Sequence, residues 1–112
     1  MRTVTIDRND WLYGENGGQL VSEDGCCIVG HLAEALGVGR DVMMDENLLS
    51  EIHVDGRKVE DHGLYQRLVD CETELEMLND GPARRRDRET SIMAKARRIG
   101  FDVRFTGMQE ER

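Results

Sequence analysis

The chain is poor in aromatic residues, with one Trp, two Tyr and two Phe among 112 residues. A hydrophobic core therefore has to be built mainly from Leu, Ile, Val, Met and Cys side chains. No apolar run approaches the roughly 18 residues that a membrane-spanning helix needs, and the first residues carry no signal-peptide pattern. We expect a single domain over residues 1–112, with 107–112 as a frayed tail.

Cysteine is also scarce. The three cysteines, Cys26, Cys27 and Cys71, are an odd number and include no Cys-x-x-Cys pair. Their number and spacing argue against a disulfide framework and against a standard four-ligand zinc site. The pattern is typical of a cytoplasmic protein whose thiols are free and mostly buried.

Nucleotide-binding and catalytic motifs are missing as well. The sequence contains neither the Gly-x-x-x-x-Gly-Lys-[Ser/Thr] pattern of a P-loop nor the Gly-x-Gly-x-x-Gly pattern of a dinucleotide-binding fold. It also offers no complete set of catalytic residues. We therefore expect a protein that is not an enzyme and that has no catalytic residues, no cofactor and no metal.

Basic residues are sparse over most of the chain, whose net charge is −8. Residues 1–80 hold 18 acidic and 6 basic side chains, whereas residues 81–112 hold 5 acidic and 9 basic. Because a phosphate backbone needs a basic surface, direct binding of nucleic acid by the whole domain is not expected. The asymmetry indicates an interaction surface or a head-to-tail homo-oligomer, and an acidic surface that maintains solubility is the alternative.

The polarity pattern predicts strands at both ends of the chain. Residues 3–7 and 102–106 alternate between polar and apolar side chains, as half-buried strands do. Residues 19–21 are expected to form a short returning strand, and residues 52–59 a β-hairpin with an Asp-Gly turn. The sequence therefore predicts an α+β fold with a small antiparallel or mixed sheet formed by the chain ends.

About three helices are expected to pack on this sheet. The first covers about residues 25–36, and Gly30 inside it predicts the close approach of another backbone or of a ligand. The second carries apolar side chains every three or four residues between Leu64 and Leu78. The expected N-caps of the three helices are Asp24, Asp61 and Asp87, and the expected left-handed ends of the first and third are Gly37 or Gly39 and Gly100.

The adjacent cysteines Cys26 and Cys27 allow three interpretations. A zinc site would use Cys27 and His31, four residues apart on one helix face, together with Cys26 or Cys71. A reactive thiol would use Cys26 at the helix N-terminus with a histidine as its base. Buried thiols that behave as small apolar side chains are the commonest case, and we favour this interpretation.

Two groups of residues carry a family resemblance. They are Thr3, Val4, Thr5, Ile6, Asp7, Trp11, Gly14, Asp24, Gly25, Cys26, Cys27 and Gly30 near the N-terminus, and Asn79, Asp80, Arg88, Glu89, Ile92, Ile99, Gly100, Val103 and Phe105 near the C-terminus. In this order the sequence resembles a group of small phage and prophage proteins, over roughly the first 37 and the last 30 residues. It departs from the group between Cys27 and Gly30, where this sequence has two residues, Ile28 and Val29, and the group has one. The resemblance implies a bacteriophage origin and the cytoplasm of the host cell.

We expect a phage accessory protein that binds and neutralises a host factor, such as a component of an anti-phage defence system, by stoichiometric binding through an acidic surface. Carboxylates on that surface would imitate a phosphate backbone and occupy the basic groove of a nucleic-acid-binding host protein. The expected partner-binding residues are Asp45, Glu46, Glu72, Glu74 and Glu76, with Arg84, Arg85, Arg86 and Arg88 as a second patch.

Two other functions stay open at this point. One is a ligand-binding protein that sequesters a nucleotide or a similar anion near Trp11 and the start of the first helix. Its expected ligand-binding residues are Trp11, Tyr13, Gly17, Gly18, Cys26 and Cys27. The other is a small enzyme that depends on a thiol or a metal.

Overall fold

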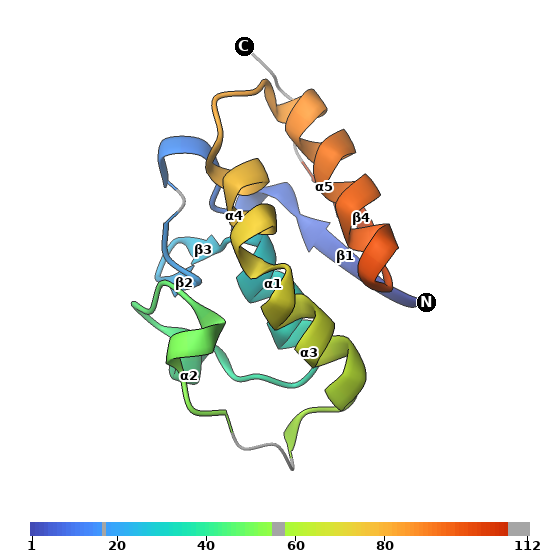
Figure 1. Cartoon of the computed structure of the whole chain (residues 1–112). Coiled ribbons are helices and arrows are strands. Elements are labelled where there is room, and N and C mark those ends of the chain that lie inside the picture. Colours follow the sequence, from blue (N-terminus) through green and yellow to red (C-terminus); the bar gives the residue numbers. More distant parts are fainter. Residues whose placement is uncertain (17, 55–57, 108–112) are drawn as a thin grey trace.

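In the described residues three short strands come first, five α-helices follow, and a fourth strand comes after them (Figure 1). The computed structural model describes residues 1–16, 18–54 and 58–107. The elements are β1 (Arg2–Asp7), β2 (Val21–Ser22), β3 (Gly25–Cys26), α1 (Ile28–Ala35), α2 (Arg40–Met43), α3 (His62–Asp70), α4 (Glu72–Asp80), α5 (Arg85–Ile99) and β4 (Phe101–Thr106), with 3₁₀ turns at Arg8–Asp10, Gly14–Asn16 and Leu49–Glu51. The α+β prediction is confirmed.

Strands β1 and β4 place the two ends of the chain side by side. They form a two-stranded sheet in which Val4 lies opposite Val103 and Ile6 opposite Phe105. The pair is parallel, because α5 runs back along the sheet before β4 begins. The sequence predicts an antiparallel or mixed sheet at the chain ends; the pair there is parallel, and an antiparallel pair, β2–β3, forms a second, separate sheet.

Helix α1 begins later than the sequence predicts. Asp24 is not its cap, because the chain first forms β3, and the helix begins at Ile28. The cap is Cys27, whose Sγ accepts a hydrogen bond from Gly30 N over 3.4 Å. The end of the helix follows the prediction, since Gly37 adopts a left-handed conformation with φ of 100°.

The predicted middle helix is divided in two. Asp61 caps α3 as expected, with its Oδ1 accepting from Leu64 N over 3.0 Å. The helix then breaks at Cys71, and α4 begins at the next residue, Glu72. The predicted hairpin is wrong for its described flanks, because residues 52–54 and 58–59 form no strand; its Asp-Gly turn lies outside the described residues.

Helix α5 and its connection to β4 follow the prediction except at the first turn. The N-cap is Arg84, without a side-chain hydrogen bond, and Asp87 lies inside the first turn, where its charge complements the helix dipole. Gly100 ends the helix with φ of 118°. Residues 108–112 of the expected tail lie outside the described residues.

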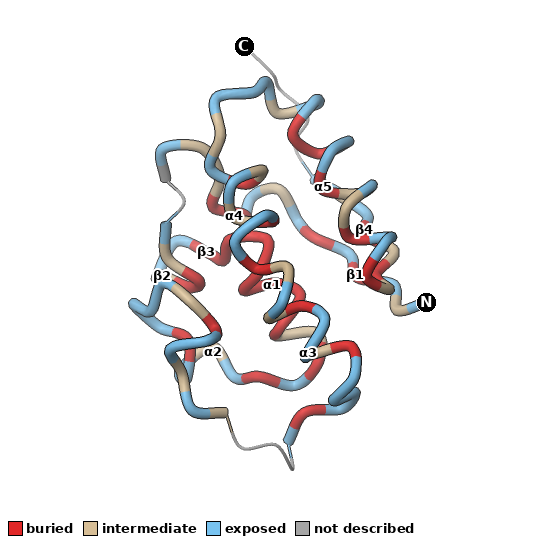
Figure 2. The backbone as a smooth tube through the Cα atoms, in the orientation of Figure 1, coloured by how far each residue is buried: buried red, intermediate tan, exposed pale blue. Residues whose placement is uncertain are grey.

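Helix α1 is the centre of the hydrophobic core. The tube in Figure 2 is buried along most of α1, and the helix contacts β1, α3 and α4. Ile28, Val29, Leu32 and Ala33 are fully buried. Among the described residues, no helix has both the length and the apolar character that crossing a membrane requires.

Candidate functional site

A groove of about 880 Å³ lies over the segment that follows β1. Its lining residues are Trp11, Leu12, Tyr13, Gln19, Ser22, Glu23, Asp24, Met44 and Asp45. They come from three separate stretches of sequence that the fold brings together. The stretches meet because Val21 forms a parallel bridge with Met44 and Asp45 N donates to Val21 O over 3.1 Å.

We call the aromatic part of the lining, Trp11 and Tyr13, the floor of the groove, and its ring packing fixes Trp11. Trp11 is 4% exposed, and its ring lies 4.4 Å from the ring of Tyr13 and 4.6 Å from that of Phe105, measured between centroids. Tyr13 is half-buried, and the Arg88 guanidinium lies 5.0 Å from its centroid. Met44 is 39% exposed and offers an apolar contact to an occupant of the groove.

The rim of the groove is acidic. Glu23, Asp24 and Asp45 are exposed, and no Lys or Arg is among the described lining residues. Asp45 has φ of 61°, a backbone conformation that is uncommon for a residue other than glycine. Three carboxylates around an apolar floor attract a cation and repel an anion.

Asn79 joins three segments beneath the groove, whereas the sequence analysis names it only among the residues that carry the family resemblance. Its Oδ1 accepts from Trp11 Nε1 over 2.8 Å and from Ile28 N over 3.0 Å. Its Nδ2 donates to Leu12 O over 2.9 Å. Because Asn79 is fully buried, these three bonds fix the groove floor to the N-terminus of α1 and to α4.

One residue of the predicted acidic contact surface is buried. Glu72 is 2% exposed, and its carboxylate accepts from Leu49 N over 2.5 Å and from Ser50 N over 3.2 Å. It therefore holds the Leu49–Glu51 turn and is not available to a partner. Glu74 is exposed on α4, where it pairs with Lys95, and Glu76 is half-buried on the same helix. Asp45 rims the groove and Glu46 is its exposed neighbour.

Two of the four arginines in the predicted basic patch, Arg85 and Arg88, are also not exposed. Arg88 is 5% exposed, and its Nη2 donates to Gly81 O. Arg85 Nε lies 3.6 Å from a carboxylate oxygen of Glu89, which also accepts both bonds of a bidentate pair with Arg8 at 2.8 Å. Only Arg84 and Arg86 of the four are exposed.

The residues predicted to bind an anion do not form an anion site. Cys26 and Cys27 are buried and do not line the groove, while Gly18 is exposed and Gly17 lies outside the described residues. At the start of α1, Ile28 N already donates to Asn79, and Gly30 N to Cys27. Together with the acidic rim, this disfavours a nucleotide at the groove.

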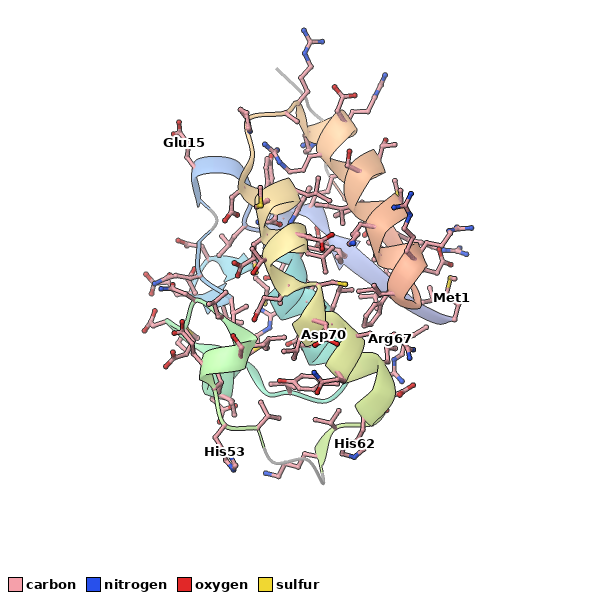
Figure 3. All side chains as sticks on the ribbon, in the orientation of Figure 1. Met1, Glu15, His53, His62, Arg67 and Asp70 are labelled. Atoms are coloured by element: carbon pink, nitrogen blue, oxygen red, sulfur yellow. The ribbon has the colours of Figure 1, made fainter. Side chains whose placement is uncertain are left out.

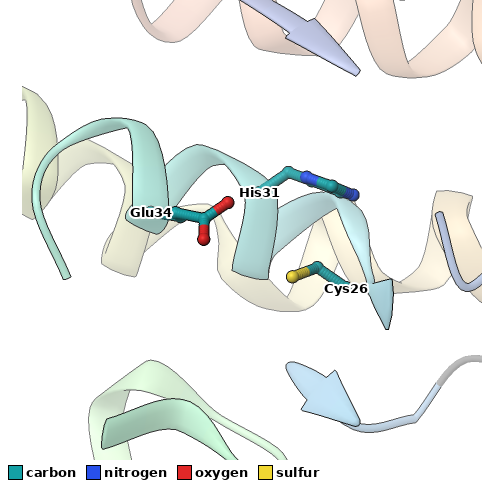
Figure 4. Close-up of side chains that lie close together, drawn as sticks. All are labelled: Cys26, His31 and Glu34. Atoms are coloured by element: carbon teal, nitrogen blue, oxygen red, sulfur yellow. The ribbon is translucent and has the colours of Figure 1, made fainter. Parts of the chain in front are cut away.

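The adjacent thiols are poor nucleophiles. Burial raises the pKa of both Cys26 and Cys27 to about 12, so both stay protonated at neutral pH. Figure 4 shows a different grouping from the expected Cys27–His31 pair: the ligand atoms of Cys26, His31 and Glu34 lie within 4.8 Å of one another. Sequence reasoning missed Glu34, although its spacing of three from His31 places both on one helix face.

A comparison of the chain with models of protein families, with curated proteins and with solved structures finds no match. The resemblance to phage and prophage proteins therefore stays a prediction from the sequence.

Glu76→Gln is expected to change how stability depends on pH. Burial and the nearby carboxylates of Glu72, Asp80 and Glu51 raise the pKa of Glu76 from 4.5 to about 7. A folded-state pKa above the unfolded value means that stability falls as pH rises from 4.5 to about 7. After allowance for solvent screening, the variant should be more stable than the native protein by roughly 1–2 kcal/mol above that window and equal to it below.

Thermal unfolding of both proteins across this pH range measures the effect. Glu46→Gln, which removes one charge from an exposed loop position, is the control and should not reproduce the gain. Parallel pH profiles for the native protein and Glu76→Gln would contradict the account of this helix.

Proposed function

We propose that this protein is a non-enzymatic binding protein that holds a basic segment of a partner in the acidic groove over Trp11. The observation that carries the proposal is the combination of a fixed apolar floor with a rim of three carboxylates, Glu23, Asp24 and Asp45. Binding at this site neutralises the partner stoichiometrically, because a basic segment held in the groove cannot engage another acidic ligand.

The groove fits the two parts of an arginine or lysine side chain. The aliphatic stem of such a residue packs on the exposed surface of Met44 and on Tyr13, while its charged head meets the rim carboxylates. Asn79 fixes the floor before binding, so little ordering of the site is needed when the partner arrives.

Net charge adds a long-range contribution. The chain carries −8, and most of the excess lies in residues 1–80. An acidic field of this kind accelerates the encounter with a basic protein and makes the association rate fall as salt increases. Strong salt dependence is therefore part of the proposal.

The partner proposed here is a host protein that binds nucleic acid, such as a component of an anti-phage defence system. Support comes from two sides: a nucleic-acid-binding protein has a basic groove that fits an acidic surface, and the sequence resembles small phage and prophage proteins. The proposed place of action is the cytoplasm of the host cell.

Affinity capture from host lysate tests this function. The bait is the full chain, compared with the variant Glu23→Gln/Asp24→Asn/Asp45→Asn, in which Asn at position 45 tolerates the left-handed backbone. One basic protein should be retained at low salt and lost at high salt, and its affinity for the variant should be at least tenfold lower. Neutralising Glu74 on α4 is the control and should leave capture intact.

Equal capture by the native protein and the triple variant would place the contact elsewhere. A small anionic molecule that purifies with the native chain, with no protein, would favour the nucleotide-sequestering alternative.

A further inference from the structure

A cluster of possible metal ligands lies next to the groove, where Cys26 contacts Leu12 and Trp11. Cys26 is the last residue of β3, and His31 and Glu34 lie three residues apart on α1. Figure 4 shows the three side chains close together, and their ligand atoms all lie within 4.8 Å of one another. A thiolate, an imidazole and a carboxylate are the groups that Zn²⁺ prefers in proteins.

The histidine is held in the form that binds a metal. His31 Nε2 lies 2.8 Å from the backbone oxygen of Asp10. A carbonyl oxygen only accepts, so Nε2 carries the hydrogen and the lone pair is on Nδ1. Metal-binding histidines commonly donate their second N–H to a carbonyl in this way, which fixes the ring.

The side chains around the cluster carry more negative than positive charge, and a bound cation would balance the excess. The guanidinium of Arg40 is shared by two carboxylates, with bonds of 2.6 Å to Asp10 and 2.5 Å to Glu34. If Glu34 turned to a metal, Arg40 would keep Asp10 as its partner. The Cys26 thiolate and the Glu34 carboxylate then contribute two negative charges, which a divalent cation neutralises.

We propose that Cys26 Sγ, His31 Nδ1 and the Glu34 carboxylate form a three-ligand site for Zn²⁺, with water as the fourth ligand. Because the three ligand atoms are at most 4.8 Å apart, a point between them lies within about 2.8 Å of each, so each atom moves by less than 1 Å to reach a zinc–ligand distance of about 2.0–2.3 Å. Binding releases the Cys26 proton to solvent, and Glu34 leaves Arg40. The half-buried Glu34 marks the open side through which the ion enters.

Such a site would reinforce the groove. Leu12 N donates to Cys26 O over 2.8 Å, and Trp11 forms a parallel bridge with Cys26. A metal held by Cys26 therefore fixes the strand on which the groove floor rests.

Titration of the reduced full chain with Co²⁺, and with Zn²⁺ against a chromophoric chelator, tests the site. We expect one ion per chain and a thiolate-to-cobalt charge-transfer band. Cys26→Ser should abolish the band, and Glu34→Gln, at a half-buried position that keeps the fold, should weaken Zn²⁺ binding at least tenfold. Arg40→Gln removes the competing cation and should tighten binding several-fold, a gain that a merely structural role for Arg40 would not produce.

Two controls separate this site from others on the chain. Cys71→Ser removes the third thiol, and His53→Gln/His62→Gln removes the two exposed histidines, which Figure 3 places at the lower end of the molecule. Both should bind as the native protein does. Absence of the charge-transfer band in the native chain, its survival in Cys26→Ser, or its loss in either control would overturn the proposal.

Discussion

Asn79→Ala is expected to lower the free energy of unfolding by about 3–5 kcal/mol, which is a large part of the stability of a domain of this size. The substitution removes the acceptor for Trp11 Nε1 and Ile28 N and the donor to Leu12 O, all at a fully buried position. Each buried polar group left without a partner costs about 1–3 kcal/mol. Denaturant unfolding, followed by circular dichroism, measures the loss.

Two further variants make this prediction specific. Asn79→Asp keeps an acceptor for Trp11 and Ile28 but loses the donor to Leu12, so its stability should lie between that of the native protein and that of the Ala variant. Asp80→Ala removes only the exposed carboxylate that accepts from Asn79 Nδ2 over 2.7 Å, and it should cost much less. If Asn79→Ala were no less stable than Asp80→Ala, Asn79 would not hold the groove floor.

Gly30→Ala is expected to destabilise the protein by at least about 3 kcal/mol, although alanine is the better helix former by roughly 1 kcal/mol. A Cβ at position 30 would overlap the backbone oxygen of Leu20. That oxygen cannot move aside freely, because it also accepts a hydrogen bond from Cys27 N over 3.0 Å. The close backbone approach that the sequence predicts at Gly30 is confirmed here.

Gly63→Ala supplies the matched control for this substitution. Gly63 is exposed in α3, and a Cβ there would meet Asp61 Oδ1 at 3.7 Å and Arg67 Nη1 at 3.8 Å, which are ordinary contacts. The same chemical change should therefore stabilise the protein by up to about 1 kcal/mol. Thermal unfolding of the two variants decides the matter, and a Gly30→Ala protein as stable as the native one would contradict the packing described here.

Local signals in the sequence predicted much of the fold. The alternation in residues 3–7 and 102–106, the cap at Asp61 and the left-handed Gly100 each depend on residues close in sequence. The start of α1 was placed wrongly because Asp24 is an ordinary cap, whereas the strand β3 that displaces it depends on pairing with Val21–Ser22. Whether β1 and β4 pair in a parallel or an antiparallel direction depends on contacts between residues at opposite ends of the chain.

The candidate site was harder to predict, for a similar reason. Trp11, Tyr13 and Asp45 were identified from the sequence, but in two different hypotheses, because only the fold brings them to one groove. The same holds for Glu72, whose charge suggested exposure until its bonds to the Leu49–Glu51 turn were seen. The sequence gives the type of each side chain and, through spacing, the face of the helix or strand on which it lies. Which distant residues that side chain contacts depends on the whole fold.

The groove itself is tested most directly by methyl NMR of the methionines. Met44 lines the groove, and Met77 is 71% exposed on α4, so each reports on one of the two surfaces that a basic ligand could use. In a titration of the full chain with an arginine-rich peptide at physiological salt, the Met44 methyl signal should shift and saturate while that of Met77 stays in place. A shift of Met77 without one of Met44, or no shift of either, would contradict the account.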